Sequence, residues 1–332
     1  MTLLFITQKL HQQDAFGILW IRAFIKRGYK VKVICLEDRV SDDINDLEIY
    51  SMGKEKGFGK LRQILRFFKY ILILKYDCVF IHMSPIWGLL GCDTFIVRRK
   101  PTYLWYTHYK HSFSVRVTEF YAKRIFCATE QSAPWLKSGS GSKKVVVGHG
   151  IDLNYWQKRE NHTQNPHALI MVHRLSRSKR VEISLRALKL LPNDYTLNIY
   201  GIEAEKDYVA EIKSLVKELD LESRVVFKGT VPMQDLKDIY SSHQLILNMA
   251  LETIDKTMLE AMTCGCYPVT TARNAESIGI KDASHEDTPE ALADFIQNFH
   301  RADANELYRI VSERHSLDGL IIKMDEYISN GA

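Results

Sequence analysis

The sequence predicts an α/β protein made of two doubly wound, Rossmann-like lobes that face a central cleft. Apolar runs of strand length alternate with stretches of helical period almost from end to end, which is the pattern of parallel α/β sheets. The alternation lapses once, in a polar stretch at residues 157–166, and then restarts. A length of 332 residues suits two domains of about 150 residues each. We expect a first lobe over residues 1–158, a second over 166–312, and a C-terminal helix over 313–332 that packs back on the first lobe.

The first lobe is expected to open with a strand, a helix and a second strand. The first strand covers residues 3–7, the helix residues 16–26 and the second strand residues 29–35, with Gly28 ending the helix between them. The remaining elements follow in order: a helix at 61–74, strands at 78–82 and 103–107, a helix at 115–123, and strands at 125–128 and 144–147. Such a sheet is parallel and is covered by helices on both faces.

The second lobe repeats this alternation. Its expected elements are a strand at 168–173, a helix at 181–190, a strand at 195–200, an amphipathic helix around 209–219, and strands at 225–228, 245–248 and 268–271. Open α/β sheets bind their ligands at the carboxyl ends of the strands, so we expect the chemistry at those ends, in the cleft.

Composition excludes several classes of protein. Hydrophobic residues make up 46% and charged residues 26%, which are values of globular proteins and not of collagen-like or disordered chains. Lys75 and Asp77 interrupt the longest apolar runs well short of the roughly 20 residues that a membrane-spanning helix needs. The N-terminus fits a first strand better than a signal peptide, and the six cysteines contain no C-x-x-C pair. We therefore expect a cytoplasmic protein without disulfides or zinc.

The charge is unevenly distributed along the chain. Residues 1–150 hold 24 Lys and Arg against 12 Asp and Glu, whereas the rest of the chain holds 21 against 28. This asymmetry indicates that the first half meets a phosphorylated small molecule or an acidic membrane surface, with nucleic acid disfavoured, or that it is a solvated basic surface. Residues 60–72 combine basic and aromatic residues at helical period, which fits either an interfacial helix or a sheet-covering helix with a basic outer face.

Two carboxylates lie close to an expected helix start. A strand ends shortly before Glu252, and a helix is expected to begin near Lys256 and to contain Glu260. The backbone N–H groups of Lys256, Thr257 and Met258 would then lie at a helix N-terminus, where phosphate oxygens bind readily. A carboxylate there can accept hydrogen bonds from sugar or ribose hydroxyls. The alternative is a solvated Glu252 and a Glu260 that only interacts with the helix dipole.

Cations gather at another turn between a strand and a helix. Arg174 and Lys179 lie five residues apart there, and an Arg with a Lys is the usual pair for neutralising a diphosphate as it becomes a leaving group. A solvated basic loop is the alternative. His108 follows an expected strand of the first lobe, either as a site residue or as a structural histidine.

Together these stretches closely resemble the retaining glycosyltransferases of family 4, which have the GT-B fold. The family has two glutamates separated by seven residues that run into E-A-M-x-x-G and then P-V, and an R-L-x-x-x-K element. The matching residues are Glu252, Glu260, Ala261, Met262, Gly265, Pro268 and Val269 for the first, and Arg174, Leu175 and Lys179 for the second. Residues 147–152 resemble the family's hinge sequence, and residues 106–108 its histidine region.

The resemblance implies a role for each of these residues. Arg174 and Lys179, with the helix start at Lys256, Thr257 and Met258, would bind the donor diphosphate, Glu260 the ribose, and Lys228 and Gly229 the base. Glu252 and His108 would act on the transferred sugar. The donor would be a UDP or GDP sugar, and no metal would be needed. The acceptor would be a glycan or a lipid-linked molecule of envelope assembly, with peripheral contact to an acidic membrane.

The chain departs from the family at the predicted donor site and after the first strand, where the family's paired glycines are absent. The usual E-G-F-G is Glu252-Thr253-Ile254-Asp255 here, without either glycine, and the usual G-R-L begins with His173. A catalytically silent nucleotide-sugar-binding protein therefore stays open as an alternative, as does a nucleotide-sugar epimerase or hydrolase of the same fold. A dinucleotide oxidoreductase is disfavoured because neither lobe opens with G-x-G-x-x-G.

Overall fold

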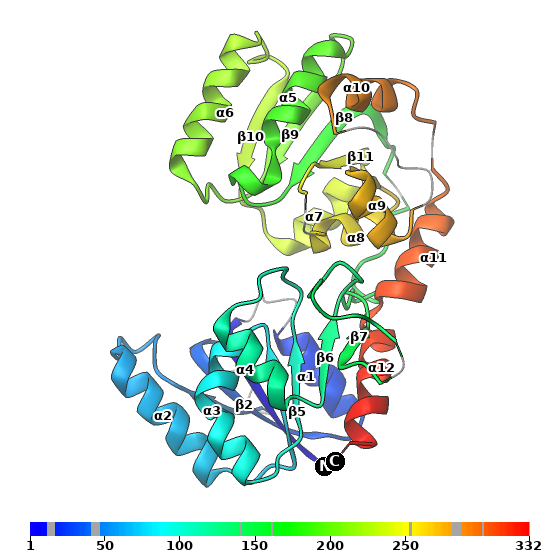
Figure 1. Ribbon diagram of the computed structural model, residues 1–332. Helices are drawn as coiled ribbons and strands as arrows, with labels where there is room; N and C mark the ends of the chain where they lie inside the picture. Colours follow the sequence, from blue (N-terminus) through cyan, green and yellow to red (C-terminus); the bar gives the residue numbers. More distant parts are fainter. Residues whose placement is uncertain are drawn as a thin grey trace. The chain divides into compact units, whose positions relative to one another are not determined.

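The computed structural model describes residues 1–11, 17–40, 47–139, 141–160, 162–251, 254–280, 287–300 and 302–331. The chain divides into two compact units, one formed by Met1–Gly150 with Leu317–Ala332 and the other by Ile151–Ser316. Each unit is a parallel β-sheet with helices packed on it, which confirms the predicted fold class (Figure 1). Among the described residues, no helix is long and apolar enough to cross a membrane.

The first unit contains a seven-stranded sheet in the order β3-β2-β1-β4-β5-β6-β7. Its strands are β1 (Thr2–His11), β2 (Lys30–Arg39), β3 (Glu48–Ser51), β4 (Cys78–His82), β5 (Thr102–Trp105), β6 (Arg124–Cys127) and β7 (Lys144–Val146). Its helices are α1 (Gly17–Lys26), α2 (Lys60–Ile73), α3 (Pro85–Val97), α4 (Phe113–Tyr121) and α12 (Leu317–Ser329). Every strand pair is parallel, as the continuous apolar runs of these strands predict.

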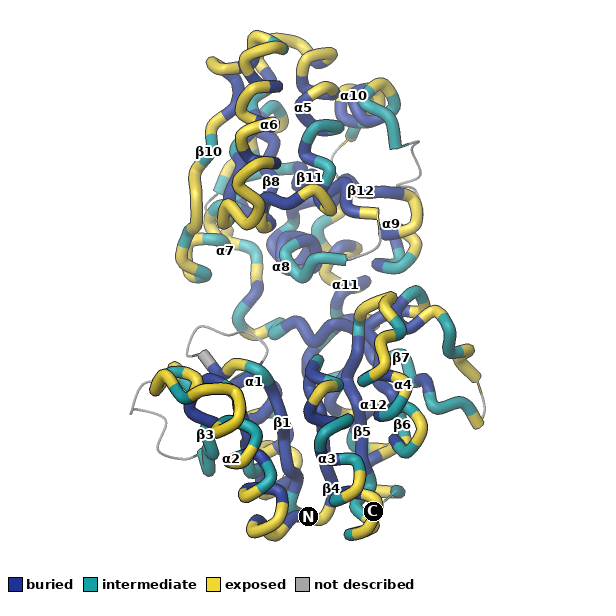
Figure 2. The backbone as a smooth tube through the Cα atoms, turned by 60° about the vertical axis from the view of Figure 1, so that its left-hand side comes forward, coloured by how far each residue is buried: buried dark blue, intermediate teal, exposed yellow. Residues whose placement is uncertain are grey.

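Helices cover both faces of this sheet because successive residues of β1 point to opposite sides. Leu3 and Phe5 pack in the core layer under α1 and α12, whereas Leu4 and Ile6 pack in the layer under α2, α3 and α4. All four side chains are fully buried, and Figure 2 shows β1 and its neighbouring strands as the buried centre of the unit.

The C-terminal helix α12 belongs to the first unit, where it lies beside α1 (Figure 1). Asp325 on α12 accepts hydrogen bonds from Arg27 at 2.6 Å and from the Tyr29 hydroxyl at 2.5 Å. Tyr103 on β5 donates to the carbonyl of Tyr327 at 3.2 Å. These bonds hold α12 against segments that lie between 224 and 298 residues earlier in the sequence.

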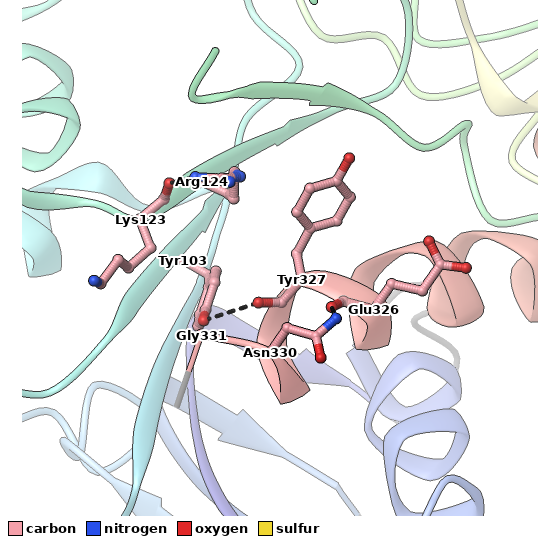
Figure 3. Close-up of a pocket in the computed structure, with 7 residues that line it drawn as sticks. All are labelled: Tyr103, Lys123, Arg124, Glu326, Tyr327, Asn330 and Gly331. Atoms are coloured by element: carbon pink, nitrogen blue, oxygen red, sulfur yellow. Dashed lines mark hydrogen bonds between the residues drawn. The ribbon is translucent and has the colours of Figure 1, made fainter. Parts of the chain in front are cut away.

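A cavity of about 530 Å³ lies at the end of α12 (Figure 3). It is lined by Tyr103, Lys123, Arg124, Glu326, Tyr327, Asn330 and Gly331. Because Arg124 is the first residue of β6, this cavity lies at the amino end of that strand. Ligands of parallel sheets bind at the opposite, carboxyl ends, so the cavity is not where the predicted chemistry belongs.

The second unit contains a five-stranded sheet in the order β10-β9-β8-β11-β12, and it too is parallel. Its strands are β8 (Asn165–Val172), β9 (Thr196–Tyr200), β10 (Val225–Gly229), β11 (His243–Asn248) and β12 (Tyr267–Thr270). Its helices are the 3-10 turn η1 (Arg177–Lys179), α5 (Val181–Leu190), α6 (Lys206–Glu218), α7 (Met233–Ser241), α8 (Lys256–Thr263), α9 (Ala272–Ile278), α10 (Pro289–Gln297) and α11 (Ala304–His315).

The division between the units lies at Gly150, ahead of the expected end of the first lobe at residue 158. Ile151 and Trp156 are buried in the core of the second unit, which explains the earlier division. Part of the polar stretch also belongs to this unit, since the Gln164 side-chain amide donates to the carbonyls of His243 and Gly265. The polar composition of residues 157–166 predicts a linker between the units, but the contacts of Gln164 show that the end of this stretch packs on the second unit.

Candidate functional site

The strand order of the second unit places its ligand crevice between β8 and β11. The chain leaves β8 toward β9 on one side and later returns to β11 on the other, so the two connections diverge at this point. Parallel sheets bind ligands at such a switch point, outside the carboxyl ends of the strands. His173 and Arg174 follow β8 here, and Met249 and Ala250 follow β11 (Figure 1).

A buried ion pair lies at this switch point. The Lys179 ammonium, at the end of η1, donates to the two carboxylate oxygens of Asp255 at 2.7 and 2.6 Å. The Lys179 side chain is only 4% exposed, while that of Asp255 is 23% exposed. The Asn248 side-chain amide, at the end of β11, donates to the same carboxylate at 2.6 Å. The ends of η1 and β11 and the start of α8 therefore meet at the Asp255 carboxylate.

The other cations of the same turn have different surroundings. Arg177 forms an exposed ion pair with Glu211. Arg180, in the left-handed region with φ 48°, donates to the carbonyl of Met249 at 2.7 Å and to Asp287 at 2.8 Å. The exposed Arg174 side chain makes no hydrogen bond or ion pair with any residue that the structure describes. Of the two cations predicted to hold a diphosphate, Arg174 thus has an open guanidinium and Lys179 is paired with Asp255.

Helix α8 begins at Lys256, as the sequence predicts, directly beside the ion pair. The Thr257 hydroxyl donates to the carbonyl of Val172 at 2.8 Å, which fixes the first turn of α8 against the end of β8. Met258 is fully buried. Asp255 is the N-cap residue, yet its side chain makes no capping hydrogen bond. The N–H of Met258 donates to the Asp255 carbonyl at 3.1 Å, so the start of α8 that lies beside the ion pair offers a helix N-terminus at Lys256 and Thr257, the kind of position where anions bind.

Glu260 lies one turn further along α8 and is 6% exposed. Its carboxyl makes no hydrogen bond or ion pair with any described residue. Burial raises the pKa of this carboxyl to about 7, against the opposing effect of the Lys256 charge. A buried carboxyl is suited to accept hydrogen bonds from the hydroxyls of a ligand.

His173 is a buried neighbour of the ion pair. Its Nδ1 is 3.1 Å from the carbonyl oxygen of Arg174, and burial lowers the pKa of its imidazole against the opposing charge of Asp255. A Cβ on Gly201 would lie 1.9 Å from the carbonyl of His173, so only a glycine allows β9 to end this close to β8. Gly201 in turn donates its N–H to the carbonyl of Gly229 at 2.8 Å.

The other predicted site residues are on further elements or outside the described residues. Lys228 and Gly229 are exposed at the end of β10, an edge strand separated from β8 by β9. His108 is in the first unit, where it follows β5, is exposed, and has its ring 5.6 Å from that of Tyr106. Glu252 lies outside the described residues. The described residues contain no group of three or more His, Cys, Asp or Glu side chains that could hold a metal ion.

Sequence reasoning missed two residues of the buried group, Asp255 and Asn248. The replacement of a family glycine by Asp255 was a signal, but nothing in the sequence connects it with Lys179, 76 residues earlier. Asn248 was identified only as the last residue of a strand, which is the position from which a polar side chain can reach a ligand.

The site lies in a segment with a recognisable family pattern. Residues 154–311 match the model of a family described as glycosyl transferases group 1. The matched segment covers nearly all of the second unit, and it supports a glycosyltransferase-type enzyme. No curated protein matches the sequence of the chain.

The fold matches solved GT-B glycosyltransferases over 99% of the chain. HepE from Anabaena, solved in complex with UDP-glucose, is 18% identical with a TM-score of 0.75, and all of its chain is covered. Sucrose-phosphate synthase from Thermosynechococcus elongatus is 15% identical with a TM-score of 0.78, and 99% of it is covered. The lipopolysaccharide outer core galactosyltransferase WaaB is 16% identical with a TM-score of 0.70, and all of it is covered. At these identities the likeness shows that the fold is GT-B.

Proposed function

We propose that the chain is a retaining, metal-independent glycosyltransferase that moves a hexosyl group from a UDP or GDP sugar to an acceptor hydroxyl. The observation that carries the proposal is that Arg174 and Lys179 follow β8, while the start of α8 and the buried Glu260 follow β11, the neighbouring strand. Cations and helix N–H groups suit a diphosphate, and a buried carboxyl suits ribose hydroxyls. The family match and the UDP-glucose bound to HepE support this interpretation.

In the proposed reaction the protein supplies electrostatic stabilisation. Arg174 and Lys179 hold the diphosphate while the bond between the anomeric carbon and the phosphate oxygen breaks, leaving an oxocarbenium-like centre. The acceptor hydroxyl forms its new bond on the same face of the sugar and gives its proton to the departing diphosphate oxygen. Glu252 and His108 act on the transferred sugar, and Lys228 and Gly229 receive the base. The positive charge of the side chains takes the place of a metal.

The experiment combines nucleotide binding with product analysis. A ligand at 100 times its dissociation constant adds about 2.7 kcal/mol of stability, so a thermal-shift panel of UDP, GDP, ADP and their sugars identifies the donor. The purified protein is then incubated with that donor and lipid-linked or glycan acceptors, and the anomeric configuration of the product is read by NMR. A new bond of retained configuration supports the proposal. Free sugar alone indicates a hydrolase, an isomerised donor an epimerase, and binding without turnover a silent sugar-binding protein.

We also propose that the acceptor is an envelope glycan or glycolipid, reached from the cytoplasmic face of an acidic membrane. Helix α2 supports this. Phe67, Tyr70 and Ile71 face the core, as in a sheet-covering helix, but Leu61, Leu65, Leu72 and Ile73 are between 59% and 72% exposed. The outer face therefore contains an apolar stripe beside the basic residues, which is the composition of an interfacial helix.

The same surface continues onto the end of α3. Arg98 donates to the carbonyl of Ile71 at 2.5 Å, which holds the C-terminal ends of α2 and α3 together, and Val97 beside it is 80% exposed. Residues 56–75 and 94–100 contain nine Lys and Arg and no Asp or Glu. Each such cation near an anionic leaflet contributes about 1 kcal/mol, an attraction that salt screens.

Vesicle co-sedimentation tests the membrane part. The protein should bind vesicles with acidic lipid at low salt and leave them at high salt, and the double variant Leu61→Ser, Leu65→Ser should lose this binding while it keeps its nucleotide affinity. Ile202→Ser, which removes an exposed isoleucine from the second unit, is the matched control. Substitution of Arg62 and Lys69 by Ser tests the contribution of charge. Arg66 is left unchanged because it donates to the Ser51 carbonyl at 2.9 Å and has a structural role. Equal binding to neutral and acidic vesicles, or binding to neither, contradicts the proposal.

A further inference from the structure

The carboxylate of Asp255 is paired with the same ammonium, that of Lys179, to which the proposed function assigns the donor diphosphate. It accepts two hydrogen bonds from the buried Lys179 ammonium and one from the Asn248 amide, all between 2.6 and 2.7 Å. It also lies at the N-terminus of α8, where the helix favours negative charge. A cation, an amide donor and a helix N-terminus together form the surroundings of a bound anion.

The Asp255 side chain does not cap helix α8, although Asp255 is the N-cap residue. An aspartate at an N-cap ordinarily accepts a hydrogen bond from an N–H of the first helical turn. Asp255 has the extended backbone of an N-cap, with φ −79° and ψ 136°, but makes no such bond. Its carboxylate is turned to Lys179 instead. The Thr257 bond to Val172 holds this helix end against the strand that leads to Lys179, so the pairing is built into the fold.

We propose that Asp255 is an internal competitor for the diphosphate of nucleotide ligands. The inference rests on the proposed function, in which Lys179 binds that diphosphate. When the site is empty, Asp255 keeps a buried ammonium paired, which avoids the cost of an isolated buried charge. When a nucleoside diphosphate enters, its like charge displaces the carboxylate from Lys179. The competition lowers affinity for the nucleoside diphosphate product and speeds its release.

The test removes the charge and keeps a residue that can cap the helix. Asp255→Asn and Asp255→Ser both satisfy this condition. Asp287→Asn is the matched control, because it removes the carboxylate paired at 2.8 Å with Arg180, the residue next to Lys179. Calorimetric titration with UDP and GDP gives the affinities, stopped-flow chase gives the dissociation rates, and inorganic pyrophosphate serves as a probe of the bare anion site.

We expect both Asp255 variants to bind the nucleoside diphosphate about tenfold more tightly, equivalent to about 1.4 kcal/mol, and through slower dissociation. The control should bind as the wild type does. Pyrophosphate should raise the melting temperature of the Asp255 variants more than that of the wild type, because it replaces the missing carboxylate beside Lys179.

The variant Lys179→Ala separates a failure of this inference from a failure of the proposed function. If Lys179→Ala weakens binding while both Asp255 variants bind as the wild type or more weakly, Asp255 positions Lys179 and does not compete, and the inference is overturned while the proposed function stands. If Lys179→Ala also has no effect, the proposed diphosphate site is wrong. Failure of both Asp255 variants to fold even in excess pyrophosphate overturns the inference too, because a true competitor is replaceable by an anion.

Discussion

The buried Glu260 makes the stability of the protein depend on pH. Burial raises the pKa of its carboxyl from 4.5 to about 7, so the folded protein holds this proton at pH values where the unfolded chain has lost it. Linkage gives the sign of the effect. The stability that the protein has with this carboxyl protonated is fully present below about pH 4.5 and is lost as the pH rises through 7. A difference of about 2.5 pH units corresponds to about 3 kcal/mol of unfolding free energy.

The substitution Glu260→Gln removes this titration and keeps the size of the side chain. We expect the variant to be about as stable as the wild type near pH 4.5 and more stable by up to about 3 kcal/mol at pH 8, as measured by urea unfolding across that range. Glu211→Gln is the control, because the neighbouring Arg177 lowers the pKa of that exposed carboxyl and no alkaline gain should follow. A Glu260→Gln stability difference that stays constant from pH 4.5 to 8 would refute the reasoning.

The other predictions concern nucleotide binding and turnover. Arg174→Ala and Lys179→Ala should each weaken binding of the nucleoside diphosphate by about 1.5 to 3 kcal/mol, as expected for charge-assisted hydrogen bonds, and unchanged calorimetric affinities in both would place the diphosphate elsewhere. Glu260→Gln should weaken binding of the bare nucleotide, which the same titration measures. His108→Ala and Glu252→Gln should lower kcat far more than nucleotide affinity, and unaltered turnover in both would remove them from the site.

The fold could be predicted largely from apolar period, and its exceptions have local causes. Helix α3 was not expected, because its apolar residues are spread around its whole circumference instead of forming one stripe. Gly88 explains how such a helix packs: a Cβ there would lie 2.3 Å from the Thr118 hydroxyl oxygen on α4. The buried residues Trp87, Gly88, Gly91 and Phe95 lie on one side of α3, but the exposed side also carries apolar residues such as Ile96 and Val97. The contrast between an apolar and a polar face, which reveals surface helices, is therefore absent from its sequence.

Helix α2 shows the opposite difficulty, because its sequence predicts a helix but not which of two surfaces it serves. Phe67 and Ile71 lie four residues apart on the face that packs on the sheet, and Leu61 and Leu65 lie four residues apart on the face that does not. Both pairs satisfy helical period equally well. The structure separates them only because the neighbouring strands and α3 fix how the helix is rotated.

The same distinction between local and tertiary information applies to the candidate site. Glu260 and the start of α8 could be predicted because a carboxylate one turn into a helix is a local pattern of a few residues. The environment of Lys179 could not, because it depends on β8 and β11 being neighbours in the sheet, and only this neighbourhood brings Asn248 and Asp255 to its ammonium. A motif identifies which charged residues are present, whereas the strand order determines which of them form ion pairs. In this chain Lys179 pairs with Asp255. Of the two cations predicted to bind the diphosphate, Arg174 is therefore the one whose guanidinium makes no hydrogen bond or ion pair with a described residue.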